Sequence, residues 1–298
     1  MGRIKVTPKA GASFTFSDFV DYLDSLIFDA NITSKSATKF TTVYNDASGK
    51  IVSVVSGSGF TYANDPDSLG VKSGTFQSIV VKSGGSTLGT ISNINIKAGA
   101  LKSAVDAENN GNATAIEKFF LNKDWNYIGT NANDIATAST RVGDGYKFNP
   151  RGNDIFDLRG GNDRLFAGDG NDVVKGGNGN DIIWGGNGRD KLFGGAGSDT
   201  LKGGAANDVL RGDTGNDILF GQAGNDRFIF DDGFGKDKIV GFKPGQDVID
   251  LRPYSGLTKF SDLTIVERNG NAVIDLGTDE ITLGGVSKAA LDADDFLI

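Results

Sequence analysis

The chain has 298 residues, enough for two domains or for one long repeat domain with flanking segments. It contains no Cys and no His, which excludes disulfides, thiolate nucleophiles, a Ser-His-Asp triad and the usual zinc sites. The net charge is −8, and the excess lies entirely after residue 130, because residues 1–130 hold 12 basic and 11 acidic residues and the remainder holds 18 and 27. This surplus of acid argues against nucleic acid as a partner and favours cations.

Residues 1–130 are expected to form an α+β domain. Ser17 can cap a helix in which apolar residues from Phe19 to Ile27 recur at helical spacing. Apolar runs bounded by Gly, Ser, Asn and Asp then predict strands at Lys39–Tyr44, Ile51–Ser56, Gly59–Tyr62, Phe76–Lys82 and Ile91–Ile96. The segment Thr114-Ala115-Ile116-Glu117 has the pattern of a capping box and predicts a second helix.

Few residues of this domain could carry chemistry. Glu108 and Glu117 could serve as the carboxylate pair of a glycan-acting enzyme, but their position beside a predicted helix favours a solvated face. Haem capture without His would need a Tyr ligand such as Tyr62. We therefore expect no catalytic residue, and both ideas remain as alternatives.

From Asn149 to Phe230 the pattern changes to a repeat with a period of nine residues. The period is marked by Asp154, Asp163, Asp172, Asp181, Asp190, Asp199, Asp208, Asp217 and Asp226. A large apolar residue follows each Asp two positions later, as Ile183 follows Asp181. The glycines that precede the aspartates in register are Gly168, Gly170, Gly176, Gly177, Gly179, Gly185, Gly186, Gly188, Gly194, Gly195, Gly197, Gly203 and Gly204. A fixed period with two columns of fixed chemistry indicates a repeat architecture.

Each nonapeptide is expected to divide into six turn residues and three strand residues. Glycines at the first, second and fourth places let the backbone take a positive φ, and the apolar residue faces a core. Two turns and two strands complete one coil of 18 residues, so each repeat stacks on the next but one. One edge should carry Asp154, Asp172, Asp190, Asp208 and Asp226, and the other should carry Asp163, Asp181, Asp199 and Asp217.

The stacked aspartates predict a metal between the coils. Strands stack about 4.8 Å apart, and two carboxylates at roughly 5 Å repel by about 3 kcal/mol at an effective dielectric constant of about 20. Two carboxylates and several backbone carbonyls offer flexible all-oxygen coordination, which suits Ca²⁺ better than Mg²⁺ or Zn²⁺. The predicted ligands are the nine aspartates and the glycines named with them, and the gaps allow at most four ions on one edge and three on the other, about seven in all.

These residues resemble the glycine-rich nonapeptide of the RTX proteins over about 80 residues. The resemblance implies a mainly β chain with a right-handed parallel β-roll of calcium-binding repeats over residues 131–230, preceded by the α+β domain at 1–130 and followed by a β-rich cap at 231–298. It also implies export by a type I secretion apparatus through an uncleaved C-terminal signal, to which the acidic-then-apolar segment from Asp292 to Ile298 is similar. No segment predicts a signal peptide or a membrane span.

The sequence thus predicts a secreted, extracellular protein that folds when it binds Ca²⁺ outside the cell. We expect a non-enzymatic binding, adhesion or extracellular-matrix protein, with cell-surface association and extracellular polysaccharide as candidate features and no nucleic-acid partner. The alternatives are a secreted polysaccharide-acting enzyme that uses N-terminal carboxylates and a haem-binding protein.

Overall fold

The computed structural model describes residues 4–8, 31–35, 39–46, 49–62, 71–83, 86–97, 125–128, 135–136, 141–142, 146–147 and 150–298. The chain divides into two compact units. The first comprises Met1–Thr130 and Ala136–Gly152, and the second comprises Asn131–Ile135 and Asn153–Ile298. Within the described segments, no helix is long and apolar enough to cross a membrane.

The first unit contains a largely antiparallel sheet. Its strands are β1 (Ile4–Pro8), β2 (Asn31–Lys35), β3 (Lys39–Asp46), β4 (Gly49–Tyr62), β5 (Val71–Ser83), β6 (Ser86–Lys97) and β7 (Trp125–Ile128). They lie in the order β2-β3-β4-β5-β6-β1-β7, and only β1 and β7 are parallel neighbours. A separate short hairpin joins β9 (Arg141–Val142) to β10 (Tyr146–Lys147).

The strands β3, β5 and β6 confirm three of the predicted strands in this unit. The turn expected between Ile51–Ser56 and Gly59–Tyr62 is wrong, because β4 runs through both segments. The glycine-rich stretch between them is accommodated by register shifts against β5 at Ser56/Gly57 and Ser58/Thr61, as β-bulges allow. The two predicted helices lie outside the described residues.

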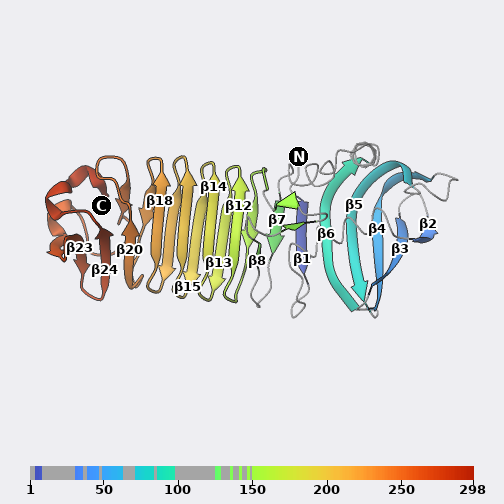
Figure 1. Ribbon diagram of the computed structural model, residues 1–298, viewed down its shortest axis with the longest axis horizontal. Helices are drawn as coiled ribbons and strands as arrows, with labels where there is room; N and C mark the ends of the chain where they lie inside the picture. The colour runs from blue at the N-terminus through green and yellow to red at the C-terminus, as the bar shows by residue number, and fades with distance from the viewer. Residues whose placement is uncertain are drawn as a thin grey trace. The chain divides into compact units, whose positions relative to one another are not determined.

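The second unit begins with strands that alternate between two parallel sheets. They are β11 (Ile155–Asp157), β12 (Arg164–Asp169), β13 (Val173–Asn178), β14 (Ile182–Asn187), β15 (Lys191–Ala196), β16 (Thr200–Ala205), β17 (Val209–Thr214), β18 (Ile218–Ala223), β19 (Arg227–Ile229), β20 (Lys236–Val240) and β21 (Val248–Asp250). One sheet has the order β11-β13-β15-β17-β19-β21, and the other has β12-β14-β16-β18-β20 (Figure 1). Val174 pairs with Leu192, so the coil of 18 residues and the predicted β-roll are confirmed.

One apolar residue from each coil strand fills the space between the two sheets. These residues are at most 2% exposed: Phe156, Leu165, Val174, Ile183, Leu192, Leu201, Leu210, Leu219, Phe228, Ile239 and Ile249. Their neighbours on either side point outward, which gives the alternating burial of each strand. Burial of a Leu, Ile or Phe side chain contributes roughly 1.5–3 kcal/mol, so these residues, one column on each sheet, supply the core of the roll.

The division into six turn residues and three strand residues is wrong. The strands β12 to β18 have six residues each, and β13 includes Gly176 and Gly177. Successive glycine segments remain in register, as Gly177 with Gly195, because their backbone groups continue the hydrogen bonding between coils. The turn between successive strands is therefore shorter than the six residues predicted, as between Asn178 and Ile182.

The C-terminal segment covers the end of the roll. It contains β22 (Thr264–Arg268), β23 (Asn271–Leu276), β24 (Asp279–Gly284), β25 (Phe296–Leu297) and three short 3₁₀ helices, η1 (Phe260–Asp262), η2 (Lys288–Ala290) and η3 (Ala293–Asp295). β22, β23 and β24 form an antiparallel meander whose last strand pairs with β20, and β25 pairs with β21. The last strand of each roll sheet, β20 or β21, is therefore paired with a strand of the C-terminal segment and is not an open edge.

Candidate metal centres along two aspartate ladders

All nine predicted aspartates are buried at the turns of the roll. Each is between 0% and 1% exposed and directly precedes a coil strand. The structure brings them together in the two expected sets, since each is bonded to the aspartate 18 residues away. We call these two rows the aspartate ladders.

One carboxylate oxygen of each ladder residue joins neighbouring coils. The Oδ1 atom of Asp172 accepts a hydrogen bond from the backbone N–H of Asp154 at 2.7 Å, and Oδ1 of Asp199 accepts from the N–H of Asp181 at 2.7 Å. The same contact recurs at every step, with lengths up to 3.0 Å. The ladder is therefore built into the main-chain geometry, and the second oxygen of each carboxylate is held in a fixed position.

The second oxygen is buried and lacks a hydrogen-bond partner along most of the roll. Among the described residues this holds for Oδ2 of Asp172, Asp181, Asp190, Asp199, Asp208, Asp217, Asp226 and Asp237. A buried polar atom left unsatisfied costs about 1–3 kcal/mol, and more when it is charged. A regular row of such atoms indicates that a further ligand, a cation, completes the site.

The burial of the ladders also perturbs their acidity. Burial raises the pKa of Asp172 to about 9 and that of Asp208 to about 8; the hydrogen bond from the neighbouring backbone N–H opposes this, and the adjacent ladder charges add to it. Burial likewise raises the pKa of Asp199 to about 7 and the pKa values of Asp190 and Asp217 to about 6. Without a cation, fully ionised ladders are therefore unfavourable at neutral pH.

The first glycine of each repeat leaves room for an oxygen-lined site. A Cβ atom at Gly185 would lie 2.2 Å from Oδ2 of Asp190 and 2.7 Å from the carbonyl oxygen of Gly203 in the next coil. The same convergence of a carboxylate and a carbonyl oxygen occurs at Gly176 and Gly194. These glycines do not have a positive φ, so that part of the prediction is wrong, and the requirement at the first place is space.

The second and fourth places do require a positive φ. Gly195 has φ +108°, and a Cβ there would lie 2.0 Å from the carbonyl oxygen of Gly177 in the preceding coil. The other predicted glycines with positive φ are Gly168, Gly170, Gly177, Gly179, Gly186, Gly188, Gly197 and Gly204. The degenerate repeats keep the same backbone without glycine, since Arg159, Ala206, Asp213 and Gln222 also have positive φ. Each such residue stores about 1 kcal/mol or more of strain.

Two further ladder residues, Asp237 and Asp247, were not predicted from the sequence. The backbone N–H of Asp217 donates to Oδ1 of Asp237 at 2.9 Å, and that of Asp226 donates to Oδ1 of Asp247 at 3.0 Å. Their separations of 20 and 21 residues break the period of nine, which is why a search by period misses them. The usable signal is local, because each lies two residues before a buried Ile, Ile239 or Ile249.

The two added rungs differ from each other. Oδ2 of Asp237 is buried without a hydrogen-bond partner, and burial raises its pKa to about 8. Oδ2 of Asp247 instead accepts from the backbone N–H of Lys243 at 2.9 Å. Asp237 thus repeats the environment of the earlier rungs, whereas Asp247 closes its ladder.

A row of asparagine side chains, which the sequence analysis did not predict, runs beside each aspartate ladder. Asn162 accepts the backbone N–H of Asn180 at 2.8 Å, and Asn180 accepts that of Ser198 at 2.8 Å. Asn171 accepts the N–H of Arg189 in the same way. The residue before each Asp is therefore often Asn because its side chain joins successive coils without a metal.

The donor set fits a hard cation that accepts many oxygens. Over the described residues, no group of three or more acidic side chains surrounds one point. An ion between coils would therefore take a few carboxylate oxygens, and main-chain carbonyls such as those of Gly194 and Gly203 would complete its shell. Such a mixed, all-oxygen shell is typical of Ca²⁺.

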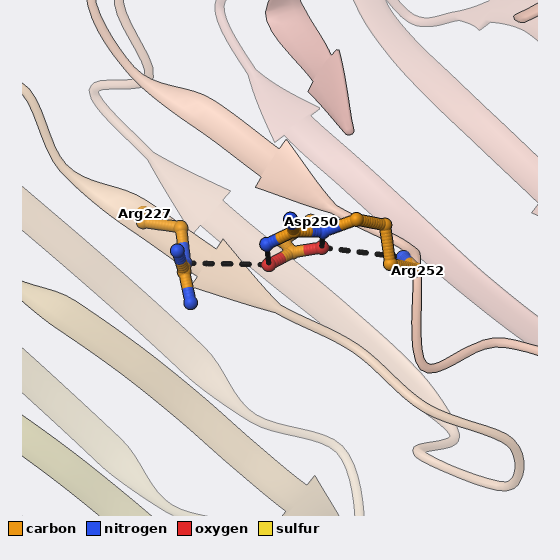
Figure 2. A network of polar contacts seen from close by, with 3 residues as sticks. All are labelled: Arg227, Asp250 and Arg252. Atoms are coloured by element: carbon orange, nitrogen blue, oxygen red, sulfur yellow. Dashed lines mark hydrogen bonds and ion pairs between the residues drawn. The ribbon is translucent and has the colours of Figure 1, made fainter. Parts of the chain in front are cut away.

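Asp250 shows that burial alone does not make a metal site. Its carboxylate accepts from Nε and Nη2 of Arg252 at 2.8 and 2.7 Å, and Nε of Arg227 lies 3.3 Å from its Oδ2 (Figure 2). The hydrogen bonds from Arg252 hold the pKa of Asp250 below its ordinary value. Both oxygens are satisfied by cationic side chains, so this carboxylate serves the packing of the last coil.

The candidate residues of the first unit are not tested by the structure. Glu108 and Glu117 lie outside the described residues. Tyr62 is the last residue of β4, and its side chain is not described.

The fold and the two ladders define a class, the calcium-binding parallel β-rolls. The family model of the RTX calcium-binding nonapeptide repeat matches residues 151–174, 166–201, 193–228 and 202–237. The chain therefore contains RTX calcium-binding nonapeptide repeats over residues 151–237, and the predicted resemblance is confirmed for that region. No curated protein matches the sequence.

Solved structures with some likeness include the extracellular lipase LipA from Serratia marcescens, with 20% identity and a TM-score of 0.31. That match covers 59% of this chain and 40% of the lipase, so the chain spans well under half of the lipase's length. The AlgE6R3 subunit of the Azotobacter vinelandii mannuronan C5-epimerase has 28% identity and a TM-score of 0.26, over 49% of this chain and 78% of that one.

Proposed function

We propose that this chain is a secreted, extracellular protein whose β-roll folds on binding Ca²⁺ and which acts as a non-enzymatic binding, adhesion or matrix protein. The observation that carries the calcium-dependent part is the row of buried Oδ2 atoms without hydrogen-bond partners, from Asp172 to Asp237. The RTX repeats support an extracellular location, where calcium is abundant.

The ladder residues have two separate tasks in this proposal. Oδ1 aligns successive coils through the backbone, and Oδ2 and the glycine carbonyls hold Ca²⁺. The ion supplies positive charge between carboxylates that would otherwise repel. Because the site exists only when coils are stacked, binding free energy becomes folding free energy, about 2.7 kcal/mol per site at a calcium concentration 100 times the dissociation constant.

The ladders contain more candidate calcium sites, the gaps between successive aspartates, than the nonapeptides alone provide. Seven gaps lie between the nine predicted aspartates, and Asp237 and Asp247 add one to each ladder. We propose that the gap at Asp237 binds Ca²⁺ like the earlier ones, because its free carboxylate oxygen repeats their geometry.

Export by a type I secretion apparatus belongs to the same proposal. In calcium-poor cytosol the ladders should stay unstacked, and an unfolded chain can pass through a narrow exporter. The segment from Asp292 to Ile298, which includes β25, remains the candidate export signal.

The calcium-dependent part is tested by far-ultraviolet circular dichroism and hydrodynamic radius on the full chain, in chelator and in millimolar Ca²⁺. We expect the β signal to rise and the radius to fall when Ca²⁺ is added, reversibly, and Mg²⁺ to be a poor substitute. A chain that is equally folded and metal-free in chelator would contradict the proposal.

The binding role is tested separately on the calcium-loaded protein. We expect calcium-dependent retention on cells or on immobilised polysaccharide, without turnover of glycans and without a Soret band when hemin is added. Glycan turnover that is lost on changing Glu108 or Glu117 would support the enzyme alternative instead, and a Soret band would support haem binding.

A further inference from the structure

The outer face of the sheet β12-β14-β16-β18-β20 has an unusual composition. The residues that flank the buried core column on these five strands point outward. None of these flanking residues is acidic. We call this surface the aromatic face, because Phe166, Trp184 and Phe220 lie on it, beside Ile182 and Ile218. Ile218 is 39% exposed and is the exposed large apolar residue of the described region.

The aromatic residues form one straight column with a lysine inside it. Phe166 pairs with Trp184, Trp184 with Lys202, and Lys202 with Phe220 on successive strands. The Lys202 Nζ atom lies 5.5 Å from the Trp184 ring centroid and 5.3 Å from that of Phe220. These distances are within the range of cation–π attraction, and all four side chains remain partly exposed. The column therefore presents rings and a positive charge along a line, one side chain per strand.

The positive charge of the aromatic face is not neutralised within the protein. In the described part of the chain, Arg164, Lys202 and Lys238 form no ion pair, although the whole chain carries a net charge of −8. Arg164 and Lys238 are exposed. A cationic face on an acidic protein indicates an anionic partner.

The outer face of the other sheet differs. It carries Asp157 and Asp250, and Arg211 is bonded to Asp231 at 2.6 Å. Asp250 is held between two arginines (Figure 2). Lys175 is exposed on that face, at the same place in the repeat as Lys202. It pairs with one aromatic residue, Phe193, and with Asp157, whereas Lys202 lies between two aromatic residues. This face offers a matched control surface.

We propose that the aromatic face binds a linear acidic polysaccharide, with rings stacked on the sugar C–H faces and Arg164, Lys202 and Lys238 paired with carboxylates. The inference rests on the proposed extracellular binding function and names its site and ligand class. Strands about 4.8 Å apart repeat these contacts along the roll, which suits an extended polymer. Two copies of this cationic face would repel each other in a two-fold dimer, and a nucleic acid would meet too few cations on a chain of this net charge.

The experiment measures binding of calcium-loaded, full-length protein to hyaluronan, a linear uronate polymer, by affinity electrophoresis and calorimetry. We expect Trp184→Ala and Lys202→Glu each to weaken binding at least tenfold. The matched variants Phe193→Ala and Lys175→Glu on the other face should change it less than twofold. Neutral dextran should not bind, and binding should weaken as salt is raised.

Folding of every variant is followed by its calcium midpoint in circular dichroism. Normal calcium-dependent folding without hyaluronan binding overturns this inference and leaves the proposed folding mechanism intact. Equal losses for variants on both faces, equal binding of single-stranded DNA, or a dimer that Trp184→Ala dissociates would also overturn it. Failure to fold with calcium contradicts the proposed function itself.

Discussion

At the scale of single residues, the two carboxylate oxygens of a ladder aspartate such as Asp199 have different environments. Oδ1 of Asp199 accepts the backbone N–H of Asp181, while Oδ2 is buried without a hydrogen-bond partner. The first oxygen stabilises the stack with or without metal. The second destabilises it until a cation arrives, because burial disfavours its charge. The same side chain therefore has opposite effects in the two metal states.

This duality predicts a crossover for Asp199→Asn. The amide keeps the acceptor at the Oδ1 position and removes the buried charge, so the metal-free roll should be stabilised by about 1–2 kcal/mol. In calcium the same variant should bind more weakly, with a calcium midpoint raised severalfold. Circular dichroism during calcium titration, beginning in chelator, measures both effects. Asp294→Asn, an equal charge change at an exposed site, should alter neither, and destabilisation of the metal-free roll by Asp199→Asn would contradict this account.

At the scale of the repeat element, glycine is required at different places for different physical reasons. The second and fourth places need a positive φ and close contact with the preceding coil, as Gly195 shows. The first place needs an empty Cβ position beside a carboxylate. Ala167 occupies the first place before Asp172 and is itself buried, so the site of the earliest complete coil differs from those that follow.

The steric reason at the first place predicts the effect of Gly185→Ala. The added methyl would collide with Oδ2 of Asp190 and the Gly203 carbonyl, without backbone strain. We expect a loss of about 1–3 kcal/mol in stability with calcium, as for other overpacked sites, and a higher calcium midpoint. Urea unfolding in millimolar Ca²⁺ measures the loss. Gly284→Ala in β24 is the control, because its nearest neighbour is the flexible Lys238 Cε at 3.2 Å, and an equal loss there would refute the argument.

At the scale of the whole second unit, the proposed calcium-dependent folding should be linked to protons as well as to calcium. The ladder carboxylates have raised pKa values in the folded state, between about 6 and about 9 for five of them in the nonapeptides, against an ordinary value of 3.8. Folding without metal therefore takes up protons. Calcium and protons should compete for the same oxygens.

The linkage predicts a pH dependence with a definite sign. Because these pKa values are raised, the metal-free roll should be most stable below about pH 4 and should lose stability as pH rises through about 6 to 9. Metal-stripped protein should therefore gain β signal on acidification from about pH 8 to about pH 5.5. In the same range the calcium midpoint should increase as pH falls. Circular dichroism at fixed ionic strength measures both, and loss of β signal on acidification without metal would contradict the linkage.

The sequence by itself determined the repeat, its coil of 18 residues, the core column and the nine ladder positions, because each depends on a period that is visible in one dimension. It also predicted the oxygen chemistry of the site. It misassigned the length of the strands and the reason for the first glycine, since both depend on how a coil lies against the next one. Only the structure identifies Asp237 and Asp247 as ladder residues, because the segments that lead to them are longer than nine residues and break the period. The column of Phe166, Trp184, Lys202 and Phe220 likewise exists only through strand pairing, which sets residues 18 apart side by side.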